Sequence, residues 1–333
     1  MSDPAAMSDP AAMSDPAAMT DPAAVPDPAA VPAPAAVPDP AAEEHRALHR
    51  PPAEPPHTLR YGGHPDQVCD LWPAADPGAP AVLLIHGGFW RQEYDRRHLS
   101  PLAAHLAAHG FTVGLVEYRR SGGADGWAET LDDLARAVDT LPGEQPPLLL
   151  GHSAGGHLAL WAAARHLLPP DAPWRGGRRP RGVLAVAPVA DLAGAVRDGL
   201  GAGAATAFLG GGDRVAARLP YADPAALGPT GVPTVLLHGE DDPDVPLAQS
   251  RVYAAADPGV RLVVLPGTGH FAPVDPGTAA CTALLDALGG LADATAHAGS
   301  GGPADLPAGP ERAAPTVAAA IPPATGRQRR SSK

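Results

Sequence analysis

Short apolar runs alternate with helix-forming segments through the middle of this 333-residue chain. Runs of this kind are typical of strands that are buried on both faces of a parallel sheet, and the segments between them are long enough for the helices that connect such strands. We therefore expect an α/β fold with a mostly parallel, doubly wound sheet flanked by helices. The runs that predict strands cover residues 68–72, 81–86, 112–117, 148–151, 183–187, 234–238 and 261–265.

The segments between the strands repeat apolar residues with the period of a helix. Leu99, Leu102 and Leu106 share one face of such a helix, and Gly110 lies where the residue after its C-terminus belongs. The same pattern predicts helices at residues 131–141, 157–168 and 249–256. Residues 191–233 fit the alternation poorly because they contain several glycines, and we expect them to form a short lid or loop segment.

Composition separates one folded domain from two tails. The 43 proline and 38 glycine residues are concentrated toward the ends of the chain. Residues 1–42 are seven tandem hexads of the MSDPAA type, and proline at this spacing interrupts both helices and strand pairing. We therefore expect a disordered arm at residues 1–56, a single domain at residues 57–292 and a disordered tail at residues 293–333.

Charge and cysteine content disfavour several classes of protein. The formal net charge of −12 argues against a nucleic-acid partner, since phosphate binding requires clustered lysine and arginine. Cys69 and Cys281 lack the spacing of a zinc site, and two free thiols are favoured over a disulfide.

No apolar stretch reaches the roughly 18 residues of a membrane span, and the N-terminus lacks the pattern of a signal peptide. We expect a cytoplasmic protein that binds no metal, cofactor or membrane and acts on a small molecule.

A glycine-flanked serine follows the apolar run at residues 148–151. Gly151, Ser153 and Gly155 form the pattern G-x-S-x-G, with a predicted strand directly before it and a predicted helix directly after it. This is the context of a nucleophile elbow, in which a strained turn presents the serine hydroxyl above the sheet. The same pattern in an ordinary glycine-rich turn would have no chemical role.

A serine nucleophile requires a base and an acid that orients the base. His270 is the favoured base among 14 histidines because it follows the last predicted strand, at the edge of the sheet where ligand sites lie. We expect His152 and His157, which flank the serine, to be packed in the structure or exposed to solvent. The acid follows the run at residues 234–238, where Glu240, Asp241, Asp242 and Asp244 are the candidates.

The run at residues 81–86 ends in His-Gly-Gly, which leaves the backbone open to a substrate. Backbone amides at this point can stabilise negative charge on a carbonyl oxygen, although a tight turn alone would also explain the glycines. We expect the donors of this oxyanion hole to be the amides of Gly88 or Phe89 together with that of Ala154. Phe89 and Trp90 are candidates for the wall of the substrate pocket, and core packing is the alternative for both.

These motifs resemble those of α/β-hydrolases of the esterase and lipase type, and among them the kynurenine formamidase (arylformamidase) branch with its bacterial relatives. The resemblance rests on HGGFW at residues 86–90, GHSAGGHLALWAA at 151–163 and HGEDDPDVP at 238–246. It implies that Ser153 is the nucleophile, His270 the base and Asp242 the orienting acid, with Asp241 and Asp244 as alternatives. It further implies hydrolysis of a small carboxylic ester or an N-formyl or aryl amide. A peptidase, a thioesterase or a catalytically silent binding protein on the same fold are the alternatives.

Overall fold

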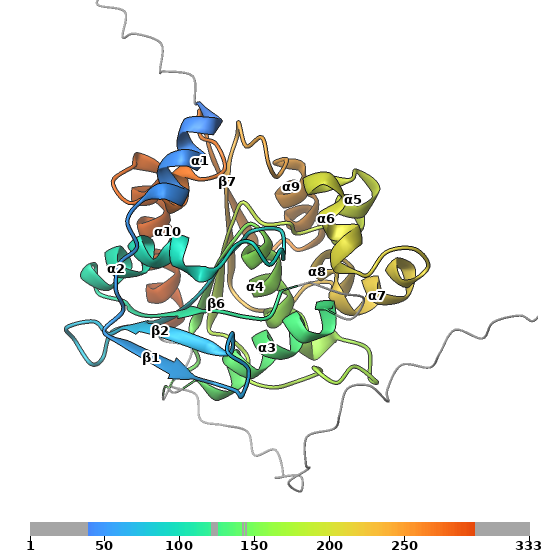
Figure 1. The fold of residues 1–333 in the computed structure, drawn as a ribbon, viewed down its shortest axis with the longest axis horizontal. Coiled ribbons are helices and arrows are strands. Elements are labelled where there is room, and N and C mark those ends of the chain that lie inside the picture. The colour runs from blue at the N-terminus through green and yellow to red at the C-terminus, as the bar shows by residue number, and fades with distance from the viewer. Residues whose placement is uncertain (1–38, 121–125, 142, 144, 297–333) are drawn as a thin grey trace, which may run out of the picture. The chain divides into compact units, whose positions relative to one another are not determined.

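The computed structural model describes residues 39–120, 126–141, 143 and 145–296 (Figure 1). In this part of the chain, eight strands form one sheet in the order β1-β2-β4-β3-β5-β6-β7-β8. The strands from β4 through β8 in this order are parallel, which confirms the predicted mostly parallel sheet. The strands are β1 (His57–Arg60), β2 (Val68–Trp72), β3 (Ala81–Ile85), β4 (Thr112–Val116), β5 (Leu148–His152), β6 (Gly182–Val186), β7 (Thr234–Gly239) and β8 (Val260–Leu265).

All seven apolar runs are strands, but one edge of the sheet differs from the prediction. Strand β2 was expected among the parallel strands, and it pairs antiparallel with both β1 and β4. Strand β1 was not predicted, because its sequence HTLR is largely polar and exposed and therefore carries no apolar run. The two antiparallel strands extend the sheet at the side remote from β8.

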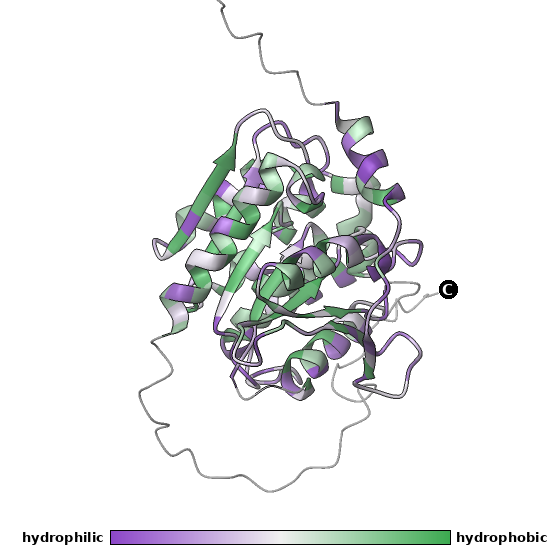
Figure 2. Cartoon of the chain, turned by 90° about the vertical axis from the view of Figure 1, so that its left-hand side faces the viewer, coloured by the Kyte–Doolittle hydropathy of each residue, from purple (hydrophilic) through white to green (hydrophobic). Residues whose placement is uncertain are grey.

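Helices cover both faces of the sheet, as the doubly wound prediction requires. Alternate strand residues point to opposite faces, so Leu83 and Ile85 join one core cluster while Val82 and Leu84 join the other. The apolar strands lie between the helices in Figure 2. Helices α3 (Gly126–Thr140), α4 (Ala154–Ala164) and α9 (Ala248–Ala256) pack on the first face, and α2 (Ser100–Ala108) and α10 (Ala279–Ala296) pack on the second.

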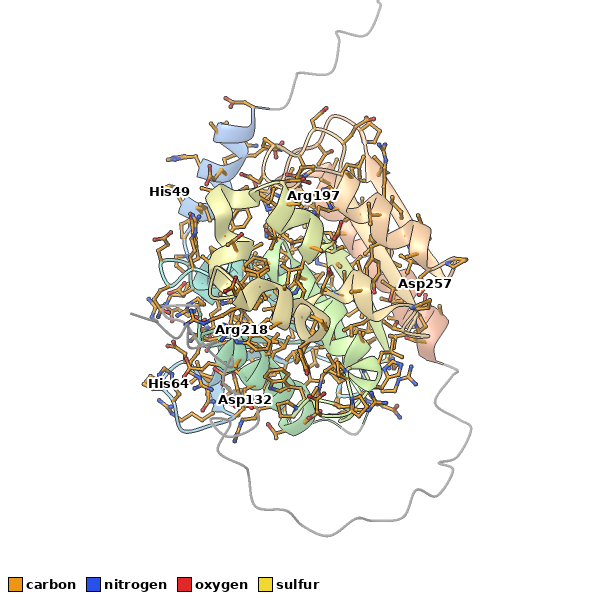
Figure 3. The ribbon with its side chains drawn as sticks, turned by 90° about the vertical axis from the view of Figure 1, so that its right-hand side faces the viewer. His49, His64, Asp132, Arg197, Arg218 and Asp257 are labelled. Carbon is orange, nitrogen blue, oxygen red and sulfur yellow. The ribbon has the colours of Figure 1, made fainter. Side chains whose placement is uncertain are left out.

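Residues 191–233 contain four helices instead of the short lid or loop that the sequence predicted. Two of the glycines that obscured the pattern, Gly201 and Gly203, lie in a kink of the second helix, where their φ angles are 59° and 79°. Arg218, labelled in Figure 3, belongs to the third helix. Its guanidinium group lies over the ring of Trp127 on α3, 5.0 Å from the ring centroid, and so joins this helix to the body. The helices are α5 (Leu192–Arg197), α6 (Leu200–Phe208), α7 (Arg214–Ala222) and α8 (Pro224–Leu227).

Both predicted domain boundaries differ from the structure. Helix α1 (Pro40–His49) lies within the stretch that was expected to be a disordered arm. Asp39 caps this helix by accepting a hydrogen bond from the amide of Ala42 at 3.2 Å, and proline occupies the first turn, where it is tolerated. Helix α10 extends to Ala296, beyond the expected boundary at residue 292. The remaining parts of the two predicted tails, residues 1–38 and 297–333, lie outside the described residues.

Cys69 and Cys281 are buried free thiols, as predicted. Burial raises the pKa of Cys69 to about 12 and that of Cys281 to about 11, so both thiols are protonated at neutral pH. In the described ranges, no helix combines the length and the apolarity that a membrane crossing would need.

Candidate active site

Ser153 occupies a strained turn between β5 and α4. Its φ and ψ angles are 58° and −120°, a conformation that residues with a side chain rarely adopt. The turn is fixed to the neighbouring strand β6, because the Ser153 amide donates a hydrogen bond to the carbonyl of Val186 at 2.9 Å. The strand, the turn and the helix therefore form the elbow that the G-x-S-x-G pattern predicts.

The two glycines of the pattern permit backbone segments to approach closely. A Cβ atom at Gly151 would lie 2.1 Å from the carbonyl oxygen of Gly155. A Cβ atom at Gly155 would lie 2.1 Å from the carbonyl oxygen of Ile85, at the end of β3. Because main-chain atoms cannot move away as a flexible side chain can, any larger residue at either position would displace the elbow.

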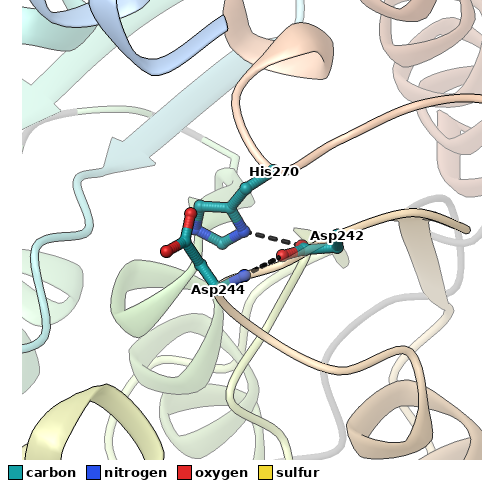
Figure 4. A group of neighbouring side chains, drawn as sticks. All are labelled: Asp242, Asp244 and His270. Carbon is teal, nitrogen blue, oxygen red and sulfur yellow. Dashed lines mark hydrogen bonds and ion pairs between the residues drawn. The ribbon is translucent and has the colours of Figure 1, made fainter. Parts of the chain in front are cut away.

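Asp242 and His270 are in direct contact at the carboxyl ends of β7 and β8 (Figure 4). The Nδ1 atom of His270 lies 2.7 Å from Oδ2 of Asp242, while Oδ1 accepts hydrogen bonds from the amides of Asp244 and Val245 at 2.9 and 2.8 Å. Since an ionised carboxylate only accepts hydrogen bonds, Nδ1 carries the proton and Nε2 is left as the acceptor. Asp241, by contrast, is exposed.

Two histidines keep the Asp242 carboxylate ionised. Burial raises the pKa of Asp242, but hydrogen bonds from His238 and His270 outweigh burial, and the net effect is a pKa well below the ordinary value. The Nε2 atom of His238 lies 3.4 Å from Oδ2 of Asp242 and 2.8 Å from the carbonyl of Val245. His238 was not among the predicted site residues, although its place near the end of β7, four residues before Asp242, was a usable signal.

Ser153 and His270 line the same cavity, which has a volume of about 120 Å³. Among the described residues, none forms a hydrogen bond with the Ser153 hydroxyl, so the shared cavity is what brings Ser153 and His270 together. Most of the lining comes from loops at the carboxyl ends of the strands, and α1 contributes two residues. The lining residues are Glu44, Leu48, Gly88, Phe89, Arg91, Tyr94, His98, His152, Ser153, Asp244, His270 and Phe271.

Two of the predicted oxyanion donors, Gly88 and Phe89, lie at this cavity, and Ala154 directly follows Ser153, which also lines it. Within the described chain, the amides of Gly88, Phe89 and Ala154 donate to no other group. The φ angles of Gly88 and Phe89 are 103° and 51°, so the loop turns its amides away from ordinary strand geometry. Ala154 begins helix α4, whose N-terminus favours negative charge. The prediction that these amides form an oxyanion hole is compatible with their lack of other acceptors in the described chain.

A buried polar network fixes the loop that carries these amides. His86 donates from Nδ1 to the carbonyl of Gly87 at 2.8 Å, and its Nε2 atom lies 2.9 Å from the Glu117 carboxylate. The Tyr118 hydroxyl donates to the carbonyl of His86 at 2.8 Å. Burial raises the pKa of Glu117, but the charge and hydrogen bond of His86 and the charge of Arg120 lower it to about 2. Glu117 is therefore a charged acceptor at neutral pH.

Trp90 lies apart from the cavity that Phe89 lines. Trp90 is 1% exposed and stacks on the ring of Phe208, with the ring centroids 4.6 Å apart, and it also contacts the ring of His157 edge-on. This position favours core packing over the predicted contact with substrate. His157 is also packed as expected, because its Nε2 atom donates to the carbonyl of Ala222 at 2.8 Å.

Two additional histidines, His98 and His152, line the cavity, and neither was among the predicted site residues. His152 packs on His270 with ring centroids 4.6 Å apart, and its Nε2 atom donates to the carbonyl of His270 at 3.1 Å. Burial, followed by the charge of His270, lowers the pKa of His152 well below its ordinary value. Burial and the charge of His86 lower the pKa of His98 to about 4. Both side chains are neutral at pH 7 and leave the serine site without additional positive charge.

Asp242, Asp244 and His270 are also close enough for a shared metal ion, since one potential ligand atom of each lies within 4.8 Å of the others. The arrangement has another cause. Asp242 already binds His270 and the amide of Asp244, so these hydrogen bonds account for the proximity of the three residues. The carboxylate of Asp244 faces the cavity, and burial raises its pKa.

The sheet order, the strained serine turn and the aspartate–histidine pair define the protein class as α/β-hydrolase. Residues 82–287 match the alpha/beta hydrolase family, and the chain belongs to this family. It is similar to the esterase LipQ of Mycobacterium tuberculosis, with 29% identity over 67% of this chain and 58% of LipQ. A probable carboxylic ester hydrolase of the same organism, LipM, is 32% identical over 32% of this chain and 27% of LipM. The chain thus spans little more than half of the first relative and about a quarter of the second.

Solved structures share the fold at lower sequence identity. Esterase B from Lactobacillus rhamnosis superposes with a TM-score of 0.60 at 22% identity, over 78% of this chain and 92% of that protein. The acetyl ester-xyloside bifunctional hydrolase from Caldicellulosiruptor lactoaceticus has a TM-score of 0.58 at 19% identity, over 72% of this chain and 96% of its own. These similarities establish the common fold.

Proposed function

We propose that the protein is a serine hydrolase that cleaves small carboxylic esters or N-formyl amides through an acyl-enzyme intermediate. The observation that carries this proposal is the 2.7 Å contact between Asp242 and His270 beside a cavity that also contains the strained Ser153. The two mycobacterial relatives are an esterase and a probable carboxylic ester hydrolase, which supports ester hydrolysis. No cofactor is required by the chemistry, since the serine, the histidine and the backbone amides supply every part of it.

In the proposed first step, the Ser153 Oγ atom attacks the substrate carbonyl carbon while His270 Nε2 takes the hydroxyl proton. The negative charge that forms on the carbonyl oxygen is stabilised by the amides of Gly88 or Phe89 and Ala154. Asp242 stabilises the resulting imidazolium through Nδ1. His270 then gives the proton to the leaving alcohol or amine as the bond to the acyl carbon breaks, and the acyl group stays on Ser153.

Water completes the cycle on the acyl-enzyme. His270 takes a proton from the water molecule, whose oxygen attacks the acyl carbon and forms a second oxyanion at the same amides. The bond to Ser153 Oγ then breaks, the serine regains its proton from His270, and the carboxylic acid leaves. The enzyme is thus returned to its starting protonation state.

The size of the cavity supports a small acyl group. Pockets for drug-sized ligands occupy roughly 300–1,000 Å³, whereas this cavity has a volume of about 120 Å³. Leu48, Phe89 and Phe271 give it apolar walls. We therefore expect formyl and acetyl groups to be accepted in preference to long acyl chains. The HGGFW and GHSAGGHL motifs, which resemble those of arylformamidases, make N-formylkynurenine a substrate to be tested beside simple esters.

The direct test replaces Ser153 by alanine and follows both turnover and covalent labelling. We expect the wild type to hydrolyse p-nitrophenyl acetate and to react with a fluorophosphonate probe, and Ser153→Ala to lose the label and about 10³-fold or more of the turnover. Thr282→Ala, on the exposed surface of α10, is the control and should behave as the wild type. A Ser153→Ala variant with undiminished turnover would remove the serine from the mechanism.

A substrate panel separates this proposal from the alternatives on the same fold. It compares N-formylkynurenine, p-nitrophenyl esters of increasing chain length, acyl thioesters and aminoacyl amides. The proposal requires the highest kcat/KM for a formyl amide or a short ester. Preference for thioesters or peptides would reassign the enzyme, and a wild type that neither turns over nor takes the probe would make it a silent member of the fold.

A further inference from the structure

Helix α1 contacts the turn that carries His270. The side chain of Glu43 on this helix is 6% exposed, and each of its carboxylate oxygens accepts one backbone hydrogen bond. Oε1 accepts from the amide of Gly269 and Oε2 from the amide of Ala272, both at 3.3 Å. These two amides flank His270 and Phe271, so the single carboxylate bridges the backbone on either side of the proposed base.

The sequence of the turn leaves room for this carboxylate. A Cβ atom at Gly269 would lie 2.4 Å from Oε2 of Glu43, which would force the two apart. Glycine at this position therefore permits the close approach, and the turn and the helix fit each other.

A second set of contacts fixes α1 to the far end of the same turn. Arg50 donates to the Asp275 carboxylate and, at 2.8 Å, to the carbonyl of Pro276. The Nε atom of Arg46 lies 3.6 Å from the same carboxylate, whose side chain is 3% exposed. The turn that follows β8 is thus attached to α1 at both ends. In Figure 4 the helix lies beside this turn, above His270.

We propose that Glu43 is a positioning residue for the reaction, and that α1 is a structural part of the active site. This inference rests on the proposed function, because it assigns the role of Glu43 through His270. Without the carboxylate, the amides of Gly269 and Ala272 lose their buried acceptor, and the turn relaxes toward other partners. A displacement of the base by about 1 Å is enough to reduce turnover by roughly 10²-fold. Glu43 itself does not line the cavity, so substrate contacts are unaffected.

The test compares Glu43→Ala and Glu43→Gln in the full-length chain. Alanine removes both acceptors, whereas glutamine keeps one oxygen and places an NH₂ group against the second amide. We expect kcat for p-nitrophenyl acetate to fall about 10- to 100-fold in Glu43→Ala and by a smaller factor in Glu43→Gln, with KM changed less than twofold. The rate of fluorophosphonate labelling should fall in the same order. Glu54→Gln is the matched control, because Glu54 is an exposed acid a few residues after the end of α1.

Thermal denaturation separates positioning from folding. A role limited to stability would lower the melting temperature but leave kcat of the folded protein at its wild-type value, and that result would overturn the proposal. If Glu43→Ala does not fold, the glutamine variant decides, and an unchanged kcat there overturns it equally. Loss of folding in both variants would assign Glu43 to folding and reject the positioning role. An inactive wild type would instead reject the proposed function itself.

Discussion

Asp242 precedes His270 by 28 residues, and its Oδ2 atom lies 2.7 Å from Nδ1 of that histidine. The carboxylate is held before any substrate arrives, because two backbone amides of its own loop bind Oδ1. The contact therefore fixes both the tautomer and the orientation of the imidazole. It also leaves Nε2 as the nitrogen available to a hydroxyl proton.

Replacing Asp242 by asparagine is expected to lower kcat by about 10³- to 10⁴-fold. The amide cannot stabilise an imidazolium, and its NH₂ group in place of Oδ2 would face the Nδ1 proton and favour the other tautomer. Steady-state kinetics with a short p-nitrophenyl ester measures the loss. Asp241→Asn changes an exposed acid of the same run and should retain wild-type kinetics. Equal losses in both variants would refute the assignment of Asp242.

The sequence could narrow the acid to this run but could not choose within it. Asp241, Asp242 and Asp244 follow the same strand, and the choice depends on the path of the loop after β7, which local propensity does not determine. The loop turns so that Asp242 receives the amides of residues 244 and 245, while the side chain of Asp241 is exposed. The serine could be located more directly, because the strand, the turn and the helix around it are consecutive in sequence.

Gly151→Ala is expected to cost more than about 3 kcal/mol of stability or to prevent folding. The new Cβ atom would lie 2.1 Å from the carbonyl oxygen of Gly155, and the backbone on both sides is packed. Gly290→Ala is the matched control on the exposed face of α10, where nothing lies within 4 Å. The free energy of unfolding of Gly290→Ala should rise by up to about 1 kcal/mol, since alanine is the better helix former. Urea unfolding of both variants measures the difference, and two similar values would contradict the close approach.

The sheet and its flanking helices were predictable because buried strands and amphipathic helices leave periodic apolar patterns. Helix α1 was missed for a physical reason. Its sequence PAAEEHRALH begins inside the last of the proline-rich repeats, and its contacts with the turn that carries His270, more than 200 residues away, are polar. Contacts of that kind leave no local periodicity. Helix α6 was missed for a different reason. Its glycines adopt positive φ angles, and a pattern-based prediction interprets such glycines as loop.

Acid is expected to destabilise the protein between pH 6.5 and pH 4 through His157. Burial outweighs the hydrogen bond to Ala222 and lowers the pKa of this histidine to about 4. The unfolded chain, with an ordinary value near 6.5, takes up the proton first, so stability falls as the pH drops through this range. The gap between the two pKa values corresponds to a loss of about 3 kcal/mol in the free energy of unfolding.

Urea unfolding at pH 7, 5.5 and 4 tests this expectation. His157→Gln keeps an N–H donor near the position of Nε2 and cannot titrate, so its stability should depend less on pH, whatever its value at pH 7. His57→Gln, on the exposed strand β1, should retain the wild-type dependence. If the free energy of unfolding of His157→Gln depends on pH as strongly as that of the wild type, other buried groups cause the loss of stability in acid.

Leu48→Ala is expected to shift the preference of the enzyme toward longer acyl chains. Leu48 reaches the cavity from α1, and removing its branched end enlarges a space of only about 120 Å³. One additional methylene in an apolar pocket is worth about 1–3 kcal/mol, so the ratio of kcat/KM for the hexanoate and acetate p-nitrophenyl esters should rise about tenfold. Val252→Ala removes an exposed apolar side chain, 48% accessible, from α9 and should leave the ratio unchanged. Because the ratio compares two substrates on one variant, a general loss of activity or of folded protein cancels from it. A ratio that stays at the wild-type value in Leu48→Ala would place the acyl group elsewhere and remove α1 from the determinants of substrate size.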